Sequence, residues 1–436
     1  MPEPQSTVFF LLLMVIFAAL ICWLILTRHA VFRVLAACLA FIPAVVFGVA
    51  AVNKYYNYYQ SWSSAITDVT SQGVPGTGLP ASPAAIAPTG PVGRGITRLL
   101  GNTVYTRLAA VHGFMLRLTV HGRASHLTRA VYVYLPPQYF QPAYRHYRFP
   151  AIELIHGYPG APQDWITVLD ITTTLANMIS HGEAKPAVLV MPDANGAKGL
   201  SLQCLNSLSG PQDATFIASD VPGYVSQVLR VWPPGRTWAI AGYSEGGFCA
   251  ANLGLQYGSH YGFAGVLSGY FRPFGNRMGQ PAKLVDPFGH DPQLRRRNTP
   301  AKELLMLPPG ARIPQFWIGS GTDRVDMRAA EVFRQLLQLR QPAVRLMLVP
   351  GGGHTMSTWR VLVPPMLEWM TPKLAENVKL VLARAKRVAQ SPALGGPGHD
   401  RRRDHEYGEE AAMAGEIVHP AAGRSVVRPG RIRRPA

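Results

Sequence analysis

The chain has 436 residues, of which 48% are hydrophobic and 15% charged, and its mean hydropathy is +0.08. This composition is too polar for a transporter with many spans, and four cysteines are too few for a scaffold built on disulfides. The formal net charge of +18 first suggests nucleic acid or an anionic membrane as a partner.

The apolar surplus is concentrated in two segments near the N-terminus, at about residues 8–27 and 34–52. Each is nearly long enough to cross a bilayer hydrocarbon core of roughly 30 Å as a helix. A cleaved signal peptide followed by a buried helix is the alternative, but a signal peptide opens with basic residues, which the first ten positions lack. The sequence therefore predicts a two-helix transmembrane hairpin.

The flanks of the two segments predict their orientation. Arg28 and Arg33 lie in the turn between them, whereas the N-terminal flank carries only Glu3. Because basic loops tend to stay on the cytoplasmic side of a membrane, we expect the turn inside and both ends of the hairpin outside. The aromatic residues between 55 and 62 then predict a belt at the membrane interface.

Two further segments are unsuited to a packed core. Residues 61–98 are rich in Gly, Pro, Ala and Ser and predict a linker, and residues 391–436 predict a basic, disordered tail. We therefore divide the chain into the hairpin (1–60), the linker, a folded domain (99–390) with a C-terminal helix, and the tail.

The folded domain contains short apolar runs bounded by turn residues, and helical patterns such as residues 172–180 and 246–257 separate several of them. Continuous apolar strands that alternate with helices predict an α/β fold with a mostly parallel sheet covered on both faces. The predicted strands are residues 131–135, 151–155, 187–191, 238–241, 263–267, 314–318 and 345–349.

The strongest local motif is GYSEG at residues 242–246, which follows a predicted strand and precedes a predicted helix. In a G-x-S-x-G motif the glycines allow a tight strand-to-helix turn that lifts the serine above the edge of the sheet. The helix N-terminus at this point favours negative charge. We therefore predict Ser244 as a nucleophile.

A base and an acid follow Ser244 in the chain order expected of an α/β-hydrolase. His354 comes after the strand 345–349 and three glycines, which let the backbone bring the imidazole to the C-terminal edge of the sheet. We prefer Asp323 as the acid because it is nearer to the end of the preceding strand. Asp326 is the alternative acid, and would otherwise cap a helix that begins near Met327.

The same chemistry needs two backbone N–H donors for an oxyanion. The residue after the nucleophile, Glu245, supplies one. The loop after the strand 151–155 reads HGYPG, and because Pro159 has no N–H we assign Tyr158 as the second donor. With this set, Ser244 would attack an ester carbonyl, and water or an alcohol would resolve the acyl-enzyme.

Four segments together resemble the putative-esterase family of α/β-hydrolases, which includes esterase D, feruloyl esterases and the antigen 85 mycolyltransferases. They are YVYLPPQY (132–139), LIHGYPG (154–160), GYSEGG (242–247) and GGGHTMSTW (351–359). The resemblance covers roughly residues 113–370. It implies an α/β-hydrolase fold, a triad of Ser244, Asp323 and His354, and oxyanion donors at Tyr158 and Glu245.

Esterase-like members of that family usually carry Met where Glu245 stands. An acid at this position suggests attraction of a substrate amine. The two spans lie outside the family domain and are similar to those of actinobacterial membrane-tethered esterases, some of which are thought to act on aminoacylated lipids.

The predicted function is that of a membrane-anchored, extracytoplasmic serine esterase acting on a lipid or cell-envelope ester, with an aminoacyl-lipid as one option. An acyltransferase with the same triad and a non-catalytic binding protein are the alternatives. The predicted partners are a membrane lipid and an anionic membrane surface. No recognition helix or aromatic–basic repeat points to nucleic acid, and no motif implies a metal or cofactor.

The four cysteines fall into two pairs. Cys22 and Cys38 lie in the predicted spans, where they act as small packing residues. Cys204 and Cys249 lie in the predicted outer domain, where a disulfide is permitted. The sequence supports a disulfide between them and two reduced thiols about equally.

Overall fold

The computed structural model describes residues 2–56, 58, 59, 61, 62, 65, 66, 109–196, 201–208, 210–273 and 287–390. The chain forms two compact units, residues 1–376 and 377–436, and the described part of the second unit, 377–390, is helical. The predicted tail and nearly all of the predicted linker lie outside the described residues. The division into hairpin, linker, domain and tail therefore remains a prediction.

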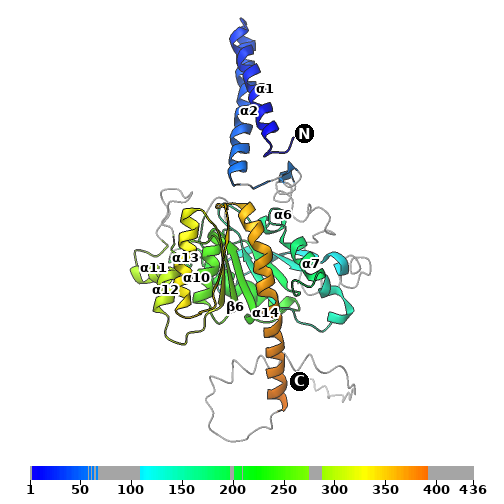
Figure 1. Ribbon diagram of the computed structural model, residues 1–436, viewed down its shortest axis with the longest axis vertical. Coiled ribbons are helices and arrows are strands. Elements are labelled where there is room, and N and C mark those ends of the chain that lie inside the picture. The colour runs from blue at the N-terminus through cyan, green and yellow to red at the C-terminus, as the bar shows by residue number, and fades with distance from the viewer. Residues whose placement is uncertain are drawn as a thin grey trace, which may run out of the picture. The chain divides into compact units, whose positions relative to one another are not determined.

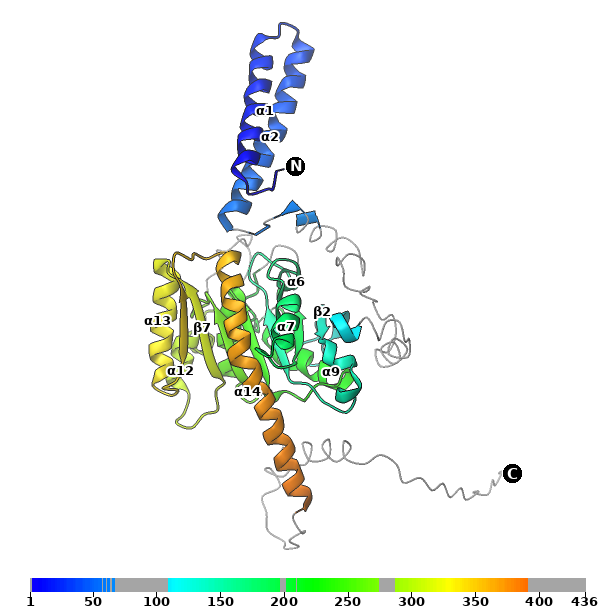
Figure 2. The same ribbon diagram turned by 45° about the vertical axis from the view of Figure 1, so that its right-hand side comes forward.

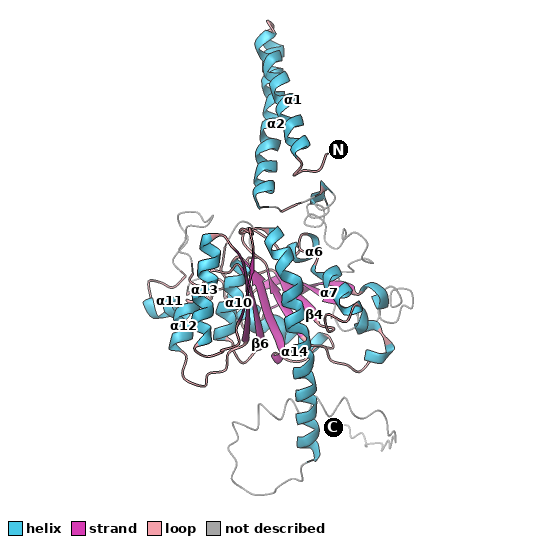
Figure 3. Ribbon diagram, in the orientation of Figure 1, coloured by secondary structure: helices cyan, strands magenta, loops and turns pink. Residues whose placement is uncertain are grey.

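Within the described residues an eight-stranded sheet forms the centre of the larger unit, in the order β1-β2-β4-β3-β5-β6-β7-β8. β2 is antiparallel to both of its neighbours, and every adjacent pair from β4 to β8 is parallel (Figure 3). The strands are β1 (Phe114–His121), β2 (Thr128–Leu135), β3 (Ala151–Ile155), β4 (Val188–Pro192), β5 (Gly235–Tyr243), β6 (Tyr261–Leu267), β7 (Gln315–Gly321) and β8 (Arg345–Val349). The predicted α/β fold with a mostly parallel sheet is confirmed.

Each of the seven predicted strands overlaps an observed one, and β3 and β8 have the predicted bounds. The strand that the sequence pattern did not indicate is β1, which lies at one edge of the sheet. Polar residues such as Arg117 and Thr119 interrupt its apolar residues. Because this strand contains no continuous apolar run, the pattern of apolar runs did not indicate it.

Helices cover both faces of the sheet because successive strand side chains point to opposite sides. In β3, Ala151 and Ile155 join one buried cluster, and Ile152 and Leu154 join the other. The first cluster includes side chains from α9 (Val221–Val228), α10 (Glu245–Gln256), α12 (Pro300–Met306) and α13 (Arg324–Gln338). The second includes side chains from α6 (Asp164–Thr167), α7 (Ile171–Ser180) and α14 (Met356–Gln390).

Figure 2 shows this layering, with α13 and α14 on opposite sides of β7. The remaining elements are short and lie in the connections between the strands and helices already named. They are η1 (Pro137–Phe140), η2 (Pro142–Tyr144), α8 (Asp213–Thr215), η3 (Phe216–Asp220) and α11 (Pro292–Arg297).

The two N-terminal apolar segments form the helices α1 (Thr7–Leu26) and α2 (Ala30–Tyr56), labelled in Figure 1. They pack against each other through Phe9, Leu13 and Ala50. Only 11% and 22% of their most apolar stretches are buried, whereas a core helix of a soluble protein would be mostly buried. Both helices are long and apolar enough to cross a membrane, and a signal sequence would share this character.

The aromatic run predicted as an interfacial belt begins at the end of α2 and continues beyond it. Tyr58 and Tyr59 pack against the buried cluster beneath α14, and the Arg360 guanidinium donates a hydrogen bond to the Tyr58 carbonyl at 3.0 Å. Tyr55, in contrast, is 76% exposed. Tyr58 and Tyr59 are thus half-buried against the folded domain, a tertiary contact that the local pattern does not encode, and the interfacial belt remains a prediction.

Candidate active site

Ser244 occupies the turn between β5 and α10, with backbone angles of φ 56° and ψ −119°. A non-glycine residue rarely adopts such a positive φ, and strained residues of this kind cluster at functional sites. The flanking glycines permit the turn: a Cβ on Gly242 would lie 2.1 Å from the Gly246 carbonyl oxygen, and one on Gly246 would lie 2.0 Å from the Ile155 carbonyl oxygen. The predicted sharp turn is therefore present, with Ser244 at its apex.

His354 follows β8 and lies between Ser244 and Asp326. Its Nε2 is 2.8 Å from Ser244 Oγ, and its Nδ1 is 2.6 Å from Asp326 Oδ2. Because a carboxylate oxygen only accepts hydrogen bonds, we assign the ring proton to Nδ1. Nε2 is then free to accept from the Ser244 hydroxyl, which is the arrangement that a general base requires.

Asp323, the preferred acid from the sequence, is not the residue beside His354. Its Oδ1 accepts a hydrogen bond from the Asp326 backbone N–H at 3.0 Å, so that it caps the N-terminus of α13. Asp326, in the first turn of α13, directs its carboxylate to His354 instead. The expected roles of the two aspartates are therefore exchanged, and α13 begins at Arg324, earlier than expected.

Asp323 points away from His354 because of the direction that the chain takes after β7. Asp323 has extended backbone angles of φ −60° and ψ 145°, the usual conformation of an N-cap residue, and its carboxylate turns back to the unpaired N–H groups of the helix. Closeness to the strand end, on which the choice of Asp323 rested, does not determine where a side chain points.

The residues predicted to form the oxyanion hole lie close to Ser244. Tyr158 lines a cavity together with Ser244 and His354, and Glu245 is the first residue of α10. Backbone N–H groups in the first turn of a helix have no partner within the helix. The structure thus brings both residues to the nucleophile, and their role as donors remains a prediction.

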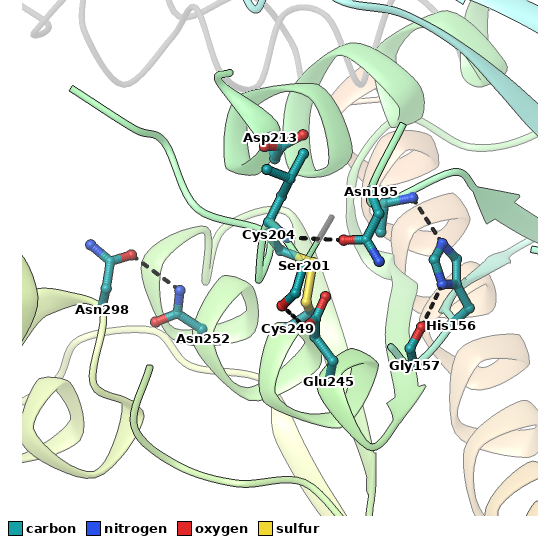
Figure 4. The surroundings of a disulfide bond; sticks show 12 residues. His156, Gly157, Asn195, Ser201, Cys204, Asp213, Glu245, Cys249, Asn252 and Asn298 are labelled. Carbon is teal, nitrogen blue, oxygen red and sulfur yellow. Dashed lines mark hydrogen bonds between the residues drawn. A yellow bond between two sulfur atoms is a disulfide. The ribbon is translucent and has the colours of Figure 1, made fainter. Parts of the chain in front are cut away.

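The side chain of Glu245 has a different environment from the one expected. The residue is 2% exposed, and its carboxylate accepts a hydrogen bond from the Ser201 hydroxyl (Figure 4). Burial raises its pKa to about 7, although hydrogen bonds from Ser201, Gln203 and Asn195 oppose this shift. A carboxylate sealed in this way does not face a substrate, so the expectation that it attracts a substrate amine is wrong.

His156 holds the loop that carries Tyr158, a role that the sequence did not reveal. It is 1% exposed, its Nδ1 lies 2.8 Å from the Gly157 carbonyl oxygen, and its Nε2 accepts from the Ala194 N–H at 3.1 Å (Figure 4). Burial lowers its pKa, so the ring is held neutral, as an imidazole that both donates and accepts. The sequence feature that could have indicated this role is the position of His156, directly after β3 and before a glycine.

Asp164 is a second buried group that the sequence did not reveal. The residue is fully buried, and its Oδ2 accepts from the Tyr243 hydroxyl at 2.9 Å and from the Ala161 N–H at 3.0 Å. Asp164 therefore connects the loop after β3 to the residue that precedes the nucleophile.

Cys204 and Cys249 form a disulfide, with their Cα atoms 5.6 Å apart. Figure 4 shows it beside Ser201 and Glu245. The bond ties the segment that follows β4 to α10, at a position little more than one turn beyond Ser244. Of the two alternatives left open by the sequence, the structure has the disulfide.

Among the residues that the structure describes, no group of three or more His, Cys, Asp or Glu side chains is arranged to hold a metal ion. The hydrogen-bonded groups of the site are a serine, a histidine and a carboxylate. This combination suits nucleophilic attack on a carbonyl carbon.

A family model described as Putative esterase matches residues 126–370, which is more than half of the chain and includes Ser244, Asp326 and His354. The chain belongs to the putative esterase family. This membership agrees with the resemblance seen in its motifs.

Curated relatives match parts of this esterase. An uncharacterized protein of Corynebacterium glutamicum is 26% identical over 56% of this chain and 57% of its own length. The MPT51 antigen of Mycobacterium leprae is 30% identical over 25% of this chain and 33% of its own length. An esterase of Mycobacterium tuberculosis is 30% identical over 32% of this chain and 27% of its own length. The matches thus span little more than half of each relative, or less.

Among solved structures, a ferulic acid esterase superposes with a TM-score of 0.53 at 19% sequence identity. The superposition covers 61% of this chain and 99% of that protein. At this identity the likeness shows a shared fold, and it supports the α/β-hydrolase architecture of the esterase.

Proposed function

We propose that this esterase is a membrane-anchored serine hydrolase that cleaves a carboxylic ester of a lipid or of the cell envelope. The observation that carries the proposal is the hydrogen-bonded line from Ser244 Oγ through His354 to Asp326, with distances of 2.8 and 2.6 Å. Membership of the esterase family supports the same chemistry.

In this mechanism His354 Nε2 takes the proton of Ser244 as Oγ attacks the ester carbonyl. The N–H groups of Tyr158 and Glu245 stabilise the negative charge that develops on the carbonyl oxygen. Asp326 stabilises the imidazolium ion, which then gives its proton to the departing alcohol. Water, deprotonated by the same imidazole, attacks the acyl-enzyme, and release of the acid restores the Ser244 hydroxyl.

The location is proposed from the N-terminal helices. Two apolar helices, joined by a turn that holds Arg28 and with Arg33 near the start of α2, suit a hairpin whose turn lies in the cytoplasm, with the catalytic domain outside. The Cys204–Cys249 disulfide supports an oxidising compartment for that domain. A basic protein at this position would also suit an anionic membrane surface, as the net charge of +18 suggests.

The first test is active-site labelling of the full chain in detergent. A fluorophosphonate should modify the wild type and the control variant Ser226→Ala, whose serine lies on α9 and donates to the Gly223 carbonyl. Ser244→Ala should not be labelled and should lose at least about 10³-fold in p-nitrophenyl ester hydrolysis, because the nucleophile is absent. Equal labelling of Ser244→Ala and wild type would refute the assignment.

The second test concerns the side of the membrane. Protease added to intact cells should digest residues beyond the hairpin, because both hairpin ends are expected outside. An epitope placed after Ala436 reports the result, and a cytoplasmic protein checks that the cells stay closed. Full protection of the epitope until the membrane is opened would contradict the proposed orientation.

A further inference from the structure

The cavity above Ser244 has walls from two distant parts of the chain. Its volume is about 350 Å³, within the range of roughly 300–1,000 Å³ that is typical of small-molecule sites. The catalytic domain supplies one wall, including Tyr158, Ser244 and His354. The end of α2 and the residues after it supply the other, through Val49, Val52, Asn53, Tyr56, Tyr58 and Tyr59.

The wall from α2 is one face of the helix. Val52, Asn53 and Tyr56 lie three, four and seven residues after Val49, which places all four on the same side of the helix. The polar member, Asn53, is occupied by the backbone of Tyr59: its Oδ1 accepts from the Tyr59 N–H at 2.7 Å, and its Nδ2 donates to the Tyr59 carbonyl at 2.9 Å. The surface that remains toward the cavity is aliphatic and aromatic.

This wall is held by hydrogen bonds to the catalytic domain. The Tyr58 side chain bonds to Asp164, and burial together with that carboxylate raises the Tyr58 pKa far above its ordinary value. Arg360, on α14, donates through Nη2 to the Tyr58 carbonyl at 3.0 Å and through Nε to the Val168 carbonyl at 2.7 Å. Because Asp164 also binds Tyr243, a short chain of contacts joins the end of the hairpin to the turn of the nucleophile.

The catalytic side of the cavity is also largely apolar. The Trp359 ring packs edge-on against His354, with ring centres 5.1 Å apart, and lies 4.6 Å from the Tyr243 ring. Met356 completes this side. Ser244, His354 and Thr355 are the polar residues on this side, and the aliphatic and aromatic residues that make up most of the lining suit a hydrocarbon.

We propose that the end of α2 is part of the substrate site, and that a hydrocarbon chain of a lipid ester binds between it and the catalytic domain. The inference rests on the proposed function, because it places the scissile carbonyl at Ser244. Val49 and Val52 are 66% and 58% exposed and continue the apolar surface of α2. A lipid chain can therefore follow this helix from the bilayer to the nucleophile without leaving an apolar environment.

The test measures chain-length preference in the full chain reconstituted in lipid nanodiscs. The ratio of kcat/KM for p-nitrophenyl octanoate to that for p-nitrophenyl acetate is compared between wild type and variants of the α2 wall. Val52→Trp, which fills the cavity, should lower the ratio roughly tenfold, and Tyr56→Ala, which removes a wall, should lower it several-fold. Octyl acetate, compared with ethyl acetate, tests a chain on the alcohol side of the ester.

Two matched variants serve as controls. Val45→Trp adds the same bulk two turns earlier on α2, and Tyr55→Ala removes a neighbouring tyrosine; neither residue lines the cavity. Both should keep the wild-type ratio. Fluorophosphonate labelling of Ser244 checks that each variant is folded.

The outcomes separate this inference from the proposed function. Wild-type ratios in both Val52→Trp and Tyr56→Ala, with chains on either side of the ester, would overturn the α2 site and leave the esterase assignment intact. Equal changes in the control variants would also overturn it, because the effect would then not depend on the cavity. Absence of labelling and of ester hydrolysis in the wild type would instead overturn the proposed function.

Discussion

In the proposed mechanism the position of the Asp326 carboxylate prepares His354 as the general base. A carboxylate beside Nδ1 keeps the proton on that nitrogen, so Nε2 of His354 faces Ser244 as an acceptor. Asp323 lies three residues away with the same side chain, yet it bonds to a backbone N–H of α13. The two positions thus carry the same side chain, and only the direction in which each carboxylate points distinguishes their contacts.

This pair offers a matched test. Asp326→Asn should lower kcat for p-nitrophenyl acetate by roughly 10³–10⁴-fold, because an amide favours the wrong tautomer of His354. Asp323→Asn should keep most of the activity, since Asn caps a helix about as well as Asp. Steady-state kinetics of both purified variants decides the matter, and a greater loss in Asp323→Asn than in Asp326→Asn would contradict the assignment.

At the scale of elements, the segment after β4 is fastened to α10 by two independent contacts. Ser201 donates to the Glu245 carboxylate, and Cys204 is bonded to Cys249. Both lie next to the turn that carries Ser244. The sequence separation of 45 residues between the cysteines means that the bond closes a substantial loop.

Loss of this disulfide should destabilise the fold. Replacement of both Cys204 and Cys249 by Ala should lower the free energy of unfolding by about 2–4 kcal/mol, because the unfolded chain regains the freedom of the open loop. Thermal melts of the full chain in detergent, with and without a reductant, measure the effect.

The control for that experiment is the double replacement of Cys22 and Cys38 by Ala. These cysteines are free thiols on α1 and α2, so their replacement should preserve the sensitivity of the wild type to reductant. The prediction fails if reductant shifts the melt of the Cys204/Cys249 variant as far as that of the wild type.

At the scale of the whole molecule, two buried acids couple stability to pH. Burial raises the pKa of Glu153, which accepts from the Tyr261 hydroxyl at 2.7 Å, to about 8, and that of Glu245 to about 7. The ordinary value for both is 4.5. Between these values the folded protein holds more protons than the unfolded chain, so the contribution of these groups to stability falls as pH rises.

The double variant Glu153→Gln, Glu245→Gln should remove this pH dependence. Relative to wild type, its melting temperature should improve progressively from about pH 5 to pH 8 and then stay level, because the cost of ionising the buried acids grows over that window. Melts at a series of pH values measure the difference. A difference that stays constant from pH 5 to pH 8 would contradict the prediction, because it would show that the two groups are already ionised in the folded protein.

Local patterns in the sequence were sufficient for several features. The apolar runs of β3 and β8, the helices α1 and α2, and the glycine-flanked turn at Ser244 each depend on neighbouring residues, whose spacing determines periodicity and allowed backbone angles. The order of serine and histidine along the chain also indicated the chemistry. These features predicted an α/β-hydrolase fold, which the structure confirms, and the serine that we propose as the nucleophile.

Tertiary structure alone decided the features that depend on distant residues. Asp326 rather than Asp323 faces His354, Glu245 turns to Ser201, Cys204 is bonded to Cys249, and Tyr58 packs beneath α14. Each of these contacts depends on the direction of a side chain and on the residues that a segment distant in the sequence brings next to it. Sequence spacing determines which residues share an element, whereas packing in three dimensions determines which partners those residues meet.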